Sequence, residues 1–160
     1  MATQNSFFLI LATVVVAFLL TLLPMPGWTV WLRPAWVLMI LIYWAMMEPE
    51  RVNVGVAWIV GIFLDVLEGT LLGEHALALT IVVYFVVRMH AQLRMYSILQ
   101  QALWVFLFSL LYQVILFCTQ GVIGDLPKTW LYWSSSLTTM LLWPWVFIIL
   151  RDYHRRFKAV

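Results

Sequence analysis

The feature that most limits the fold of this chain is a series of long apolar stretches that carry very few charges. A bilayer core about 30 Å thick is crossed by a helix of about 20 apolar residues, with 17 to 25 as the usual range. Short segments with Pro, Gly or charged residues separate six such stretches. We therefore predict an all-α, polytopic membrane protein, one integral membrane domain over residues 1–160 with six transmembrane helices. The predicted helices cover residues 7–23, 28–47, 52–67, 74–89, 100–122 and 130–150.

The low charge content makes water an unsuitable solvent for this fold. Apolar residues make up 65% of the chain and charged residues only 10%, whereas a soluble domain carries about 25% charged residues. So few charges could not cover the apolar surface of a soluble fold, and the lipid bilayer is the expected surrounding. A soluble enzyme and a disordered protein are excluded. The scattered charges argue against nucleic-acid binding, and a single cysteine, Cys118, excludes a disulfide scaffold.

The positions of Lys and Arg predict the orientation in the membrane. With six helices, both termini lie on the same side. Seven of the nine basic residues fall in the C-terminal tail or in the loops after helices two and four, and only Arg33 and Lys128 fall on the other side. By the positive-inside rule we predict cytoplasmic termini. The first helix has no basic segment before it and no cleavage site after it, so we expect a retained membrane helix rather than a signal peptide.

Asp65 is the charged residue nearest the interior of a predicted membrane helix, where a charge needs a partner or a function. It shares a helix face with Gly61 and Glu68, because the spacings are four and three. If the second and third helices form an antiparallel hairpin, Arg33 lies level with Asp65. We therefore predict an ion pair of Arg33 with Asp65 or Glu68. Hydration of the carboxylates at the outer interface and a substrate or proton site are the alternatives.

The third predicted helix carries candidate residues for partner docking. Arg51, Asn53 and Gly55 lie at its cytoplasmic start, where the simpler interpretation is a helix N-terminus with an interfacial arginine. Gly55 thins the helix at this point, and Gly61 would let another helix approach the face that carries Asp65. Both places could dock a helix of another subunit.

Pro144 lies deep in the sixth predicted helix and should kink it, because proline removes a backbone hydrogen bond. Trp143 and Trp145 flank the kink. Packing inside the bundle is the simpler interpretation, and Trp143 and Pro144 are kept as partner-docking candidates. The Ser, Thr and Gln side chains of the last two helices are expected to hydrogen-bond between helices or to their own backbone.

No catalytic or metal-binding constellation is visible in the sequence. The histidines, His75, His90 and His154, fall on two sides of the predicted membrane domain, so they cannot form a metal site or a Ser-His-Asp relay together. Cys118 has no basic neighbour in sequence that would activate its thiol. We therefore predict no enzyme activity, no catalytic residues, no metal site and no cofactor.

Several motifs, together with the length and the six spans, resemble the MreD family of rod shape-determining membrane proteins. The resemblance covers essentially the whole chain and is most specific between residues 33 and 76. The residues that carry it are RPAWVL at 33–38, Tyr43-Trp44, PERVNVG at 49–55, Gly61, Asp65, GTLLG at 69–73 and LWPW at 142–145.

The resemblance implies a non-enzymatic scaffold subunit of the cell-elongation (Rod) complex in the bacterial inner membrane. The implied partners are MreC and, within one complex, MreB, RodZ, RodA and its class B penicillin-binding protein. The implied role is control of cell shape and lateral peptidoglycan synthesis. The family is similar in fold to the S-components of energy-coupling-factor transporters, which implies an S-component-like bundle. It also implies an alternative function, a small-molecule binding or transport subunit with its ligand near Asp65, Glu68, Glu74 and His75.

Overall fold

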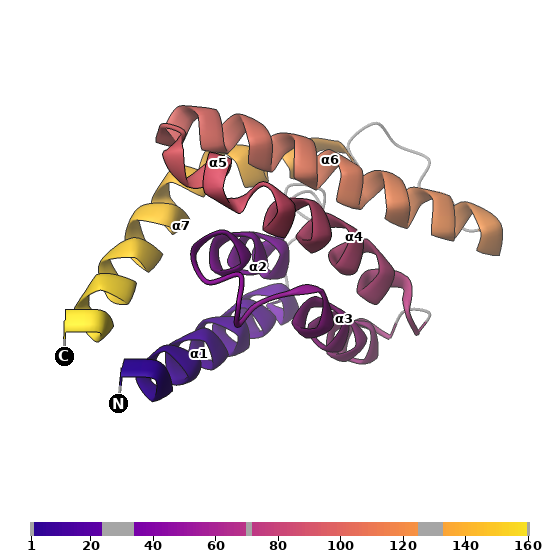
Figure 1. Cartoon of the computed structure of the whole chain (residues 1–160). Helices are drawn as coiled ribbons and strands as arrows, with labels where there is room; N and C mark the ends of the chain where they lie inside the picture. The colour runs from indigo at the N-terminus through magenta and orange to yellow at the C-terminus, as the bar shows by residue number, and fades with distance from the viewer. Residues whose placement is uncertain (1, 24–33, 70–71, 125–132, 160) are drawn as a thin grey trace.

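A computed structural model describes residues 2–23, 34–69, 72–124 and 133–159. Within these residues the chain forms helices and no strands, which confirms the all-α prediction (Figure 1). The helices are α1 (Ala2–Leu22), α2 (Trp36–Met47), α3 (Val54–Glu68), α4 (Glu74–Arg88), α5 (His90–Met95), α6 (Ile98–Ile123) and α7 (Ser134–Ala159).

Each predicted stretch contains a helix, but several bounds differ. α7 continues through the basic tail to Ala159, and α5 lies in a segment that the apolar pattern assigned to a connection. Among the described residues, one helix, over Ile98–Val122, is long and apolar enough to cross a membrane by length and composition. Shorter apolar helical stretches cover Phe7–Leu22 and Trp36–Met47.

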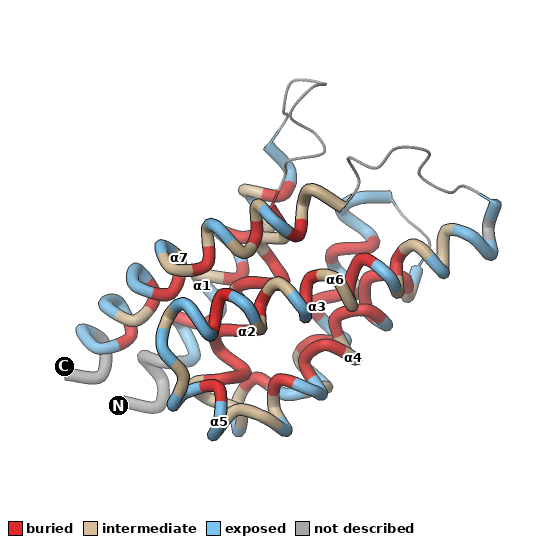
Figure 2. Tube along the Cα trace, turned by 90° about the horizontal axis from the view of Figure 1, so that it is seen from above, coloured by how far each residue is buried: buried red, intermediate tan, exposed pale blue. Residues whose placement is uncertain are grey.

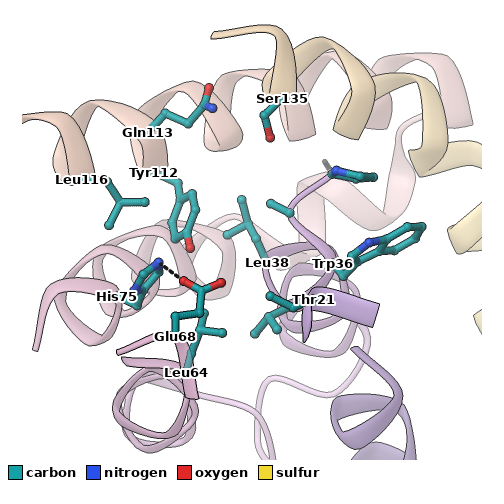
Figure 3. Close-up of a pocket in the computed structure, with 13 residues that line it drawn as sticks. Thr21, Trp36, Leu38, Leu64, Glu68, His75, Tyr112, Gln113, Leu116 and Ser135 are labelled. Carbon is teal, nitrogen blue, oxygen red and sulfur yellow. Dashed lines mark ion pairs between the residues drawn. The ribbon is translucent and has the colours of Figure 1, made fainter. Parts of the chain in front are cut away.

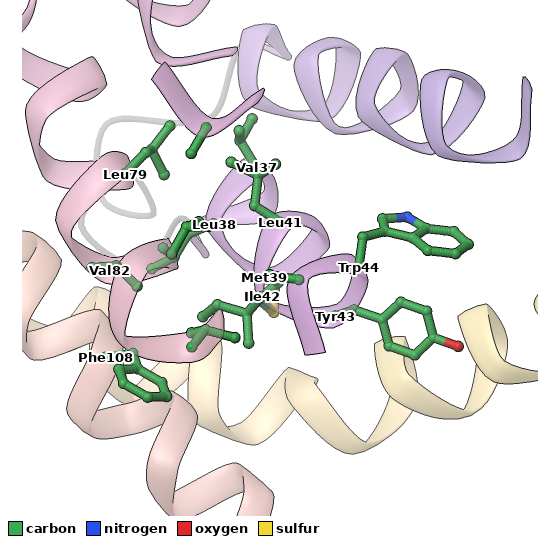
Figure 4. Packing of buried hydrophobic residues seen from close by; sticks show 14 of the residues in the cluster. Val37, Leu38, Met39, Leu41, Ile42, Tyr43, Trp44, Leu79, Val82 and Phe108 are labelled. Carbon is green, nitrogen blue, oxygen red and sulfur yellow. The ribbon is translucent and has the colours of Figure 1, made fainter. Parts of the chain in front are cut away.

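α2 is the central helix of the bundle. It packs against α1, α4, α5 and α7, and its residues from Val37 to Met46 are buried except Ile40 (Figures 1 and 4). A helix that is apolar on all sides is buried on all sides. Trp44 also satisfies its indole N–H inside this core, donating a hydrogen bond of 2.9 Å to Thr13 of α1.

α3 and α4 form the most closely packed pair of helices. Gly61 of α3 lies against Ala76 of α4, and a Cβ atom at position 61 would stand only 2.3 Å from the Ala76 Cα atom. The close helix approach that Gly61 permits is therefore made within the chain. The depth match of Arg33 with Asp65 depends on a hairpin of the second and third predicted helices, but α3 packs chiefly against α4 rather than α2.

Large apolar side chains also cover the outside of the bundle. On α1, α3, α6 and α7 they alternate with buried residues, and Figure 2 shows exposed and buried positions following one another along the helices. A soluble monomer rarely exposes so much apolar surface. Examples at least half exposed are Phe8, Phe63, Leu103, Leu141 and Trp145.

Local sequence signals explain several helix ends. Asn53 caps α3, because its side chain accepts hydrogen bonds from the N–H groups of Gly55 and Val56. Ser97 and Gln100 form a capping box at the start of α6. The start of α1 and the end of α7 lie on the same side of the molecule in both views (Figures 1 and 2).

Candidate functional site

The carboxylate of Asp65 lies at the junction of α3 and α4 and is completely buried. Its Oδ1 accepts a hydrogen bond of 2.9 Å from the His75 backbone N–H, and its Oδ2 accepts one of 2.8 Å from the Gly73 N–H. The Ala76 N–H lies 3.5 Å from Oδ2. Asp65 therefore caps the N-terminus of α4 from the neighbouring helix.

The sequence explains why this cap comes from another helix. The first N–H groups of a helix have no partner within it, and the N-cap residue of α4 is Gly73, which has no side chain to offer. Asp65 lies in the last turn of α3, just before the short connection to α4. A negative charge at this position also interacts favourably with the positive end of the helix dipole.

His75 joins two carboxylates. Its Nδ1 lies 2.7 Å from Asp65 Oδ1. Its Nε2 lies 3.2 Å from Glu68 Oε2, the ion pair that the dashed line in Figure 3 marks. Ionised carboxylates only accept hydrogen bonds. Both contacts are hydrogen bonds at the same time only if the imidazole carries two protons or one of the two carboxyl groups carries one. The Tyr112 ring of α6 lies beside the imidazole, with ring centroids 6.2 Å apart.

A pocket of about 230 Å³ opens beside this cluster. Figure 3 shows Glu68 and His75 of the α3–α4 pair on one side and Gln113 and Ser135 on the other. Polar and aromatic side chains from six helices therefore surround one small space. The other residues that line it are Thr21, Pro34, Ala35, Trp36, Val37, Leu38, Leu64, Tyr112 and Leu116.

A second polar layer connects α6 to α7. Ser136 is fully buried, donates a hydrogen bond to Gln113 Oε1 and lies 3.4 Å from the hydroxyl of Ser109, which is also fully buried. Thr139 accepts a hydrogen bond of 3.2 Å from the Ala35 N–H, just before α2. Such bonds connect neighbouring helices, as predicted for the polar residues of the last two helices.

The predicted Arg33 partner of Asp65 and Glu68 lies outside the described residues. The structure brings Asp65 and Glu68 together through His75, a residue that the sequence analysis considered only as a metal ligand, a catalytic base or a ligand contact. The signal that could have identified the cap is the combination of a glycine N-cap at Gly73 with an aspartate in the last turn of the preceding helix, at Asp65.

The other predicted site residues lie elsewhere. Arg51 lines an apolar groove of about 530 Å³ between α1 and α3 and lies 3.7 Å from Glu48. Asn53 and Gly55 are exposed at the start of α3. Trp143 is fully buried beside the Phe147 ring, whereas Pro144 lies within α7 and is partly exposed.

A second histidine contact escaped the sequence analysis. His154, near the end of α7, lies 3.1 Å from Glu48 Oε1 just after α2. The Trp44 ring packs edge-on against the imidazole, with centroids 5.0 Å apart. This contact fixes the tail part of α7 to the end of the central helix.

The chemistry available to the Asp65–His75–Glu68 cluster is hydrogen bonding and charge pairing. An aspartate that orients an imidazole is also part of hydrolytic relays, but here the second ring nitrogen meets a carboxylate instead of a hydroxyl or thiol. In the described part of the chain, no group of three His, Cys, Asp or Glu side chains is arranged to hold a metal ion.

Comparisons with known proteins agree on one family. The family profile described as rod shape-determining protein MreD matches residues 1–153. A curated relative from Haemophilus influenzae, named rod shape-determining protein MreD, is 34% identical over 154 residues, which cover 94% of this chain and 93% of the relative. No solved structure matches the chain.

Proposed function

Because the chain belongs to the MreD family of rod shape-determining proteins, we propose that it is a non-enzymatic scaffold subunit of the bacterial cell-elongation complex. Its role in cell shape follows from the family. The proposal adds that its helices hold the membrane helix of MreC and direct MreC toward the periplasm. MreB, RodZ, RodA and the class B penicillin-binding protein of RodA complete the proposed assembly.

The observation that carries the proposal is the use of the buried polar groups. Asp65, His75 and Glu68 bind one another or the N-terminus of α4. Ser109, Gln113 and Ser136 connect α6 to α7. Groups engaged in this way stabilise a rigid bundle. The six residues named in this paragraph do not form a nucleophile–base pair that could support catalysis.

The proposed setting is the inner membrane, with six spans and cytoplasmic termini. Its support is the apolar outer surface of α1, α3, α6 and α7, together with the excess of Lys and Arg on one side of the predicted helices. α3 and α4 have 15 residues each, so each rises about 22 Å as a helix. We propose that they span by tilting little and by local thinning of the bilayer.

A second candidate function has one specific observation in its favour. The 230 Å³ pocket beside His75 combines aromatic faces with carboxylate, amide and hydroxyl groups, which is the usual composition of a small-molecule site. An S-component-like binding subunit would use this pocket at the outer face, near Glu68.

One experiment separates the two functions. The tagged protein is purified in mild detergent from cells that also produce MreC, and the depleted cells are examined by microscopy. Co-purification of MreC and loss of rod shape on depletion support the scaffold. The binding subunit would be supported instead if MreC does not co-purify and rod shape is kept on depletion. In that case the purified protein should retain a vitamin-sized molecule, and the Glu68→Ala variant should lose it.

A further inference from the structure

Two side chains that line a groove on the outside of α4 carry buried polar atoms that the described residues leave without a hydrogen bond. Glu74, in the first turn of α4, is only 4% exposed, yet its Oε1 has no hydrogen-bond partner among the described residues. The hydroxyl of Thr80, further along α4, is buried and equally without a partner there. Both residues line a groove of about 440 Å³ with Trp58, Leu72, Gly73, Leu77 and Thr119, called here the α4 groove.

Thr80 differs from five other threonines of the bundle. Their hydroxyls all donate to a backbone carbonyl one turn earlier in the same helix, which satisfies a threonine in lipid without any partner. Thr80 does not make this bond. The five threonines are Thr13, Thr21, Thr119, Thr138 and Thr139.

Two unsatisfied buried groups in one groove point to a missing occupant. Nearly all buried polar groups in native proteins are hydrogen-bonded, and at the depth of Thr80, inside the hydrocarbon region, no water replaces a lost partner. We infer that the α4 groove docks a membrane-spanning helix of another protein. This helix carries a hydrogen-bond donor level with Glu74 and a second polar side chain level with Thr80.

The spacing of the two groups favours a helix over a lipid. Glu74 and Thr80 are six residues apart on α4, which corresponds to about 9 Å along the helix axis. A lipid headgroup could donate to Glu74 at the interface, but at the depth of Thr80 a lipid offers only acyl chain. A helix brings side chains at both depths. The apolar groove beside Arg51 lacks this pattern, since its lining between α1 and α3 is otherwise apolar.

A second copy of the chain fits the groove poorly. Symmetric pairing of two parallel copies brings the same residue of each copy to the same depth, so Glu74 would face a second carboxylate rather than a donor. The rim of the groove suits packing with a different helix. Trp58 and Leu77 are each about half exposed there, and tryptophan is enriched among residues that dominate binding energy.

The inference rests on the proposed function, because it requires a membrane-embedded subunit of a complex. Its test is photocrosslinking in the native membrane, with a photoreactive phenylalanine derivative replacing Leu77 at the groove or, as the control, Leu141, an exposed apolar residue of α7. We expect only the groove probe to crosslink to a membrane helix of another protein, at or next to a hydrogen-bonding side chain identified by mass spectrometry.

Two variants then test the chemistry. Thr80→Val preserves shape and removes the hydroxyl, and Glu74→Gln removes the charge. We expect each to reduce the crosslinked fraction about three- to tenfold, because each weakens one interhelical hydrogen bond. Thr138→Val, whose hydroxyl bonds to Ser134 of its own helix, is the matched control and should change nothing. The purified Thr80→Val protein should melt no lower than the parent, because no described contact of that hydroxyl is lost.

Several results would overturn the inference. They are crosslinks from position 77 to lipid or to a second copy only, no crosslink at all, or a crosslinked fraction that neither variant changes. Co-purification of MreC tests the proposed function independently. If MreC co-purifies with the unaltered protein and position 77 contacts no partner helix, the inference fails while the proposed function stands.

Discussion

The carboxylate of Asp65 holds both the backbone and the ring of His75, with Oδ1 lying 2.9 Å from the backbone nitrogen and 2.7 Å from Nδ1. One aspartate therefore caps α4 and orients the imidazole that meets Glu68. The same contact sets where α4 begins relative to α3. Because Asp65 both fixes the start of α4 and orients His75, we expect substitutions at Asp65 to lower the stability of the protein.

Asp65→Asn should destabilise the protein. The substitution removes the charge and replaces one acceptor oxygen with a donor, although the N–H groups of Gly73 and His75 both need acceptors. Loss of a hydrogen bond to a charged group costs about 1.5–3 kcal/mol, which for a chain of this size lowers the melting temperature by roughly 3–12 °C. Circular dichroism of the detergent-solubilised protein would measure it.

The control for this experiment is Asp152→Asn, an exposed aspartate on α7. A surface change of this kind alters stability by no more than about 0.5 kcal/mol. Equal melting temperatures of the Asp65→Asn and parent proteins would refute the capping role.

Two glycines of α3 should respond in opposite ways to alanine. At Gly61 a new Cβ would lie 2.3 Å from Ala76 Cα and 2.6 Å from its backbone nitrogen, so α4 must move away. We expect Gly61→Ala to lower stability by about 1–3 kcal/mol, the usual effect of overpacking. Thermal unfolding in detergent, followed by circular dichroism, is the measurement.

Gly55→Ala is the matched control on the same helix. Its Cβ would meet only Asn53 Oδ1, at 3.4 Å, and alanine is a better helix former than glycine by roughly 1 kcal/mol. We therefore expect an equal or slightly higher melting temperature in the same experiment. If the two alanine variants melted alike, the tight α3–α4 contact would be wrong.

The apolar pattern is sufficient to predict the main helices, because long apolar runs with polar interruptions have few other solutions in a bilayer. It could not predict α5, whose six residues, His90–Met95, contain no extended apolar run. The C-terminal end of α7 could not be predicted either. The basic tail after Leu150 has no apolar pattern, yet α7 continues through it, with His154 held by Glu48.

The partners of buried side chains are harder to predict from the sequence than the positions of the helices. The sequence identifies Asp65 as a residue that needs a partner, but which group meets it depends on how the helices pack. Depth matching along an assumed hairpin of the second and third helices predicts Arg33, which lies outside the described residues, so this pairing stays a prediction. In the structure α3 packs chiefly with α4, and this places the backbone N–H groups of α4 and the His75 ring within reach of Asp65, contacts that the apolar pattern does not indicate.

The hydrogen bond between Ser136 and Gln113 should stabilise the pairing of α6 with α7. Ser136→Ala leaves the Gln113 oxygen without this donor in a buried layer. Interhelical hydrogen bonds in membrane proteins are worth about 0.6 kcal/mol on average and up to about 1.7, so we expect a loss in this range. Detergent-induced unfolding followed by tryptophan fluorescence would measure it. Thr138→Val on the same helix should be neutral, and a larger effect there would contradict the assignment.

His154→Ala should release the C-terminal part of α7 while leaving the rest of the bundle folded. The imidazole lies 3.1 Å from Glu48 and packs against the Trp44 ring, so its removal takes away both contacts with the end of α2. Loss of about 1.4 kcal/mol of local stability, within the range for a typical hydrogen bond, corresponds to roughly tenfold faster amide exchange in α7 after Leu150. Hydrogen exchange with mass spectrometry would resolve this segment from α6. Tyr153→Ala, at an exposed neighbouring position, should leave exchange unchanged, whereas equal acceleration by both variants would mean that the tail is held by general packing rather than by His154.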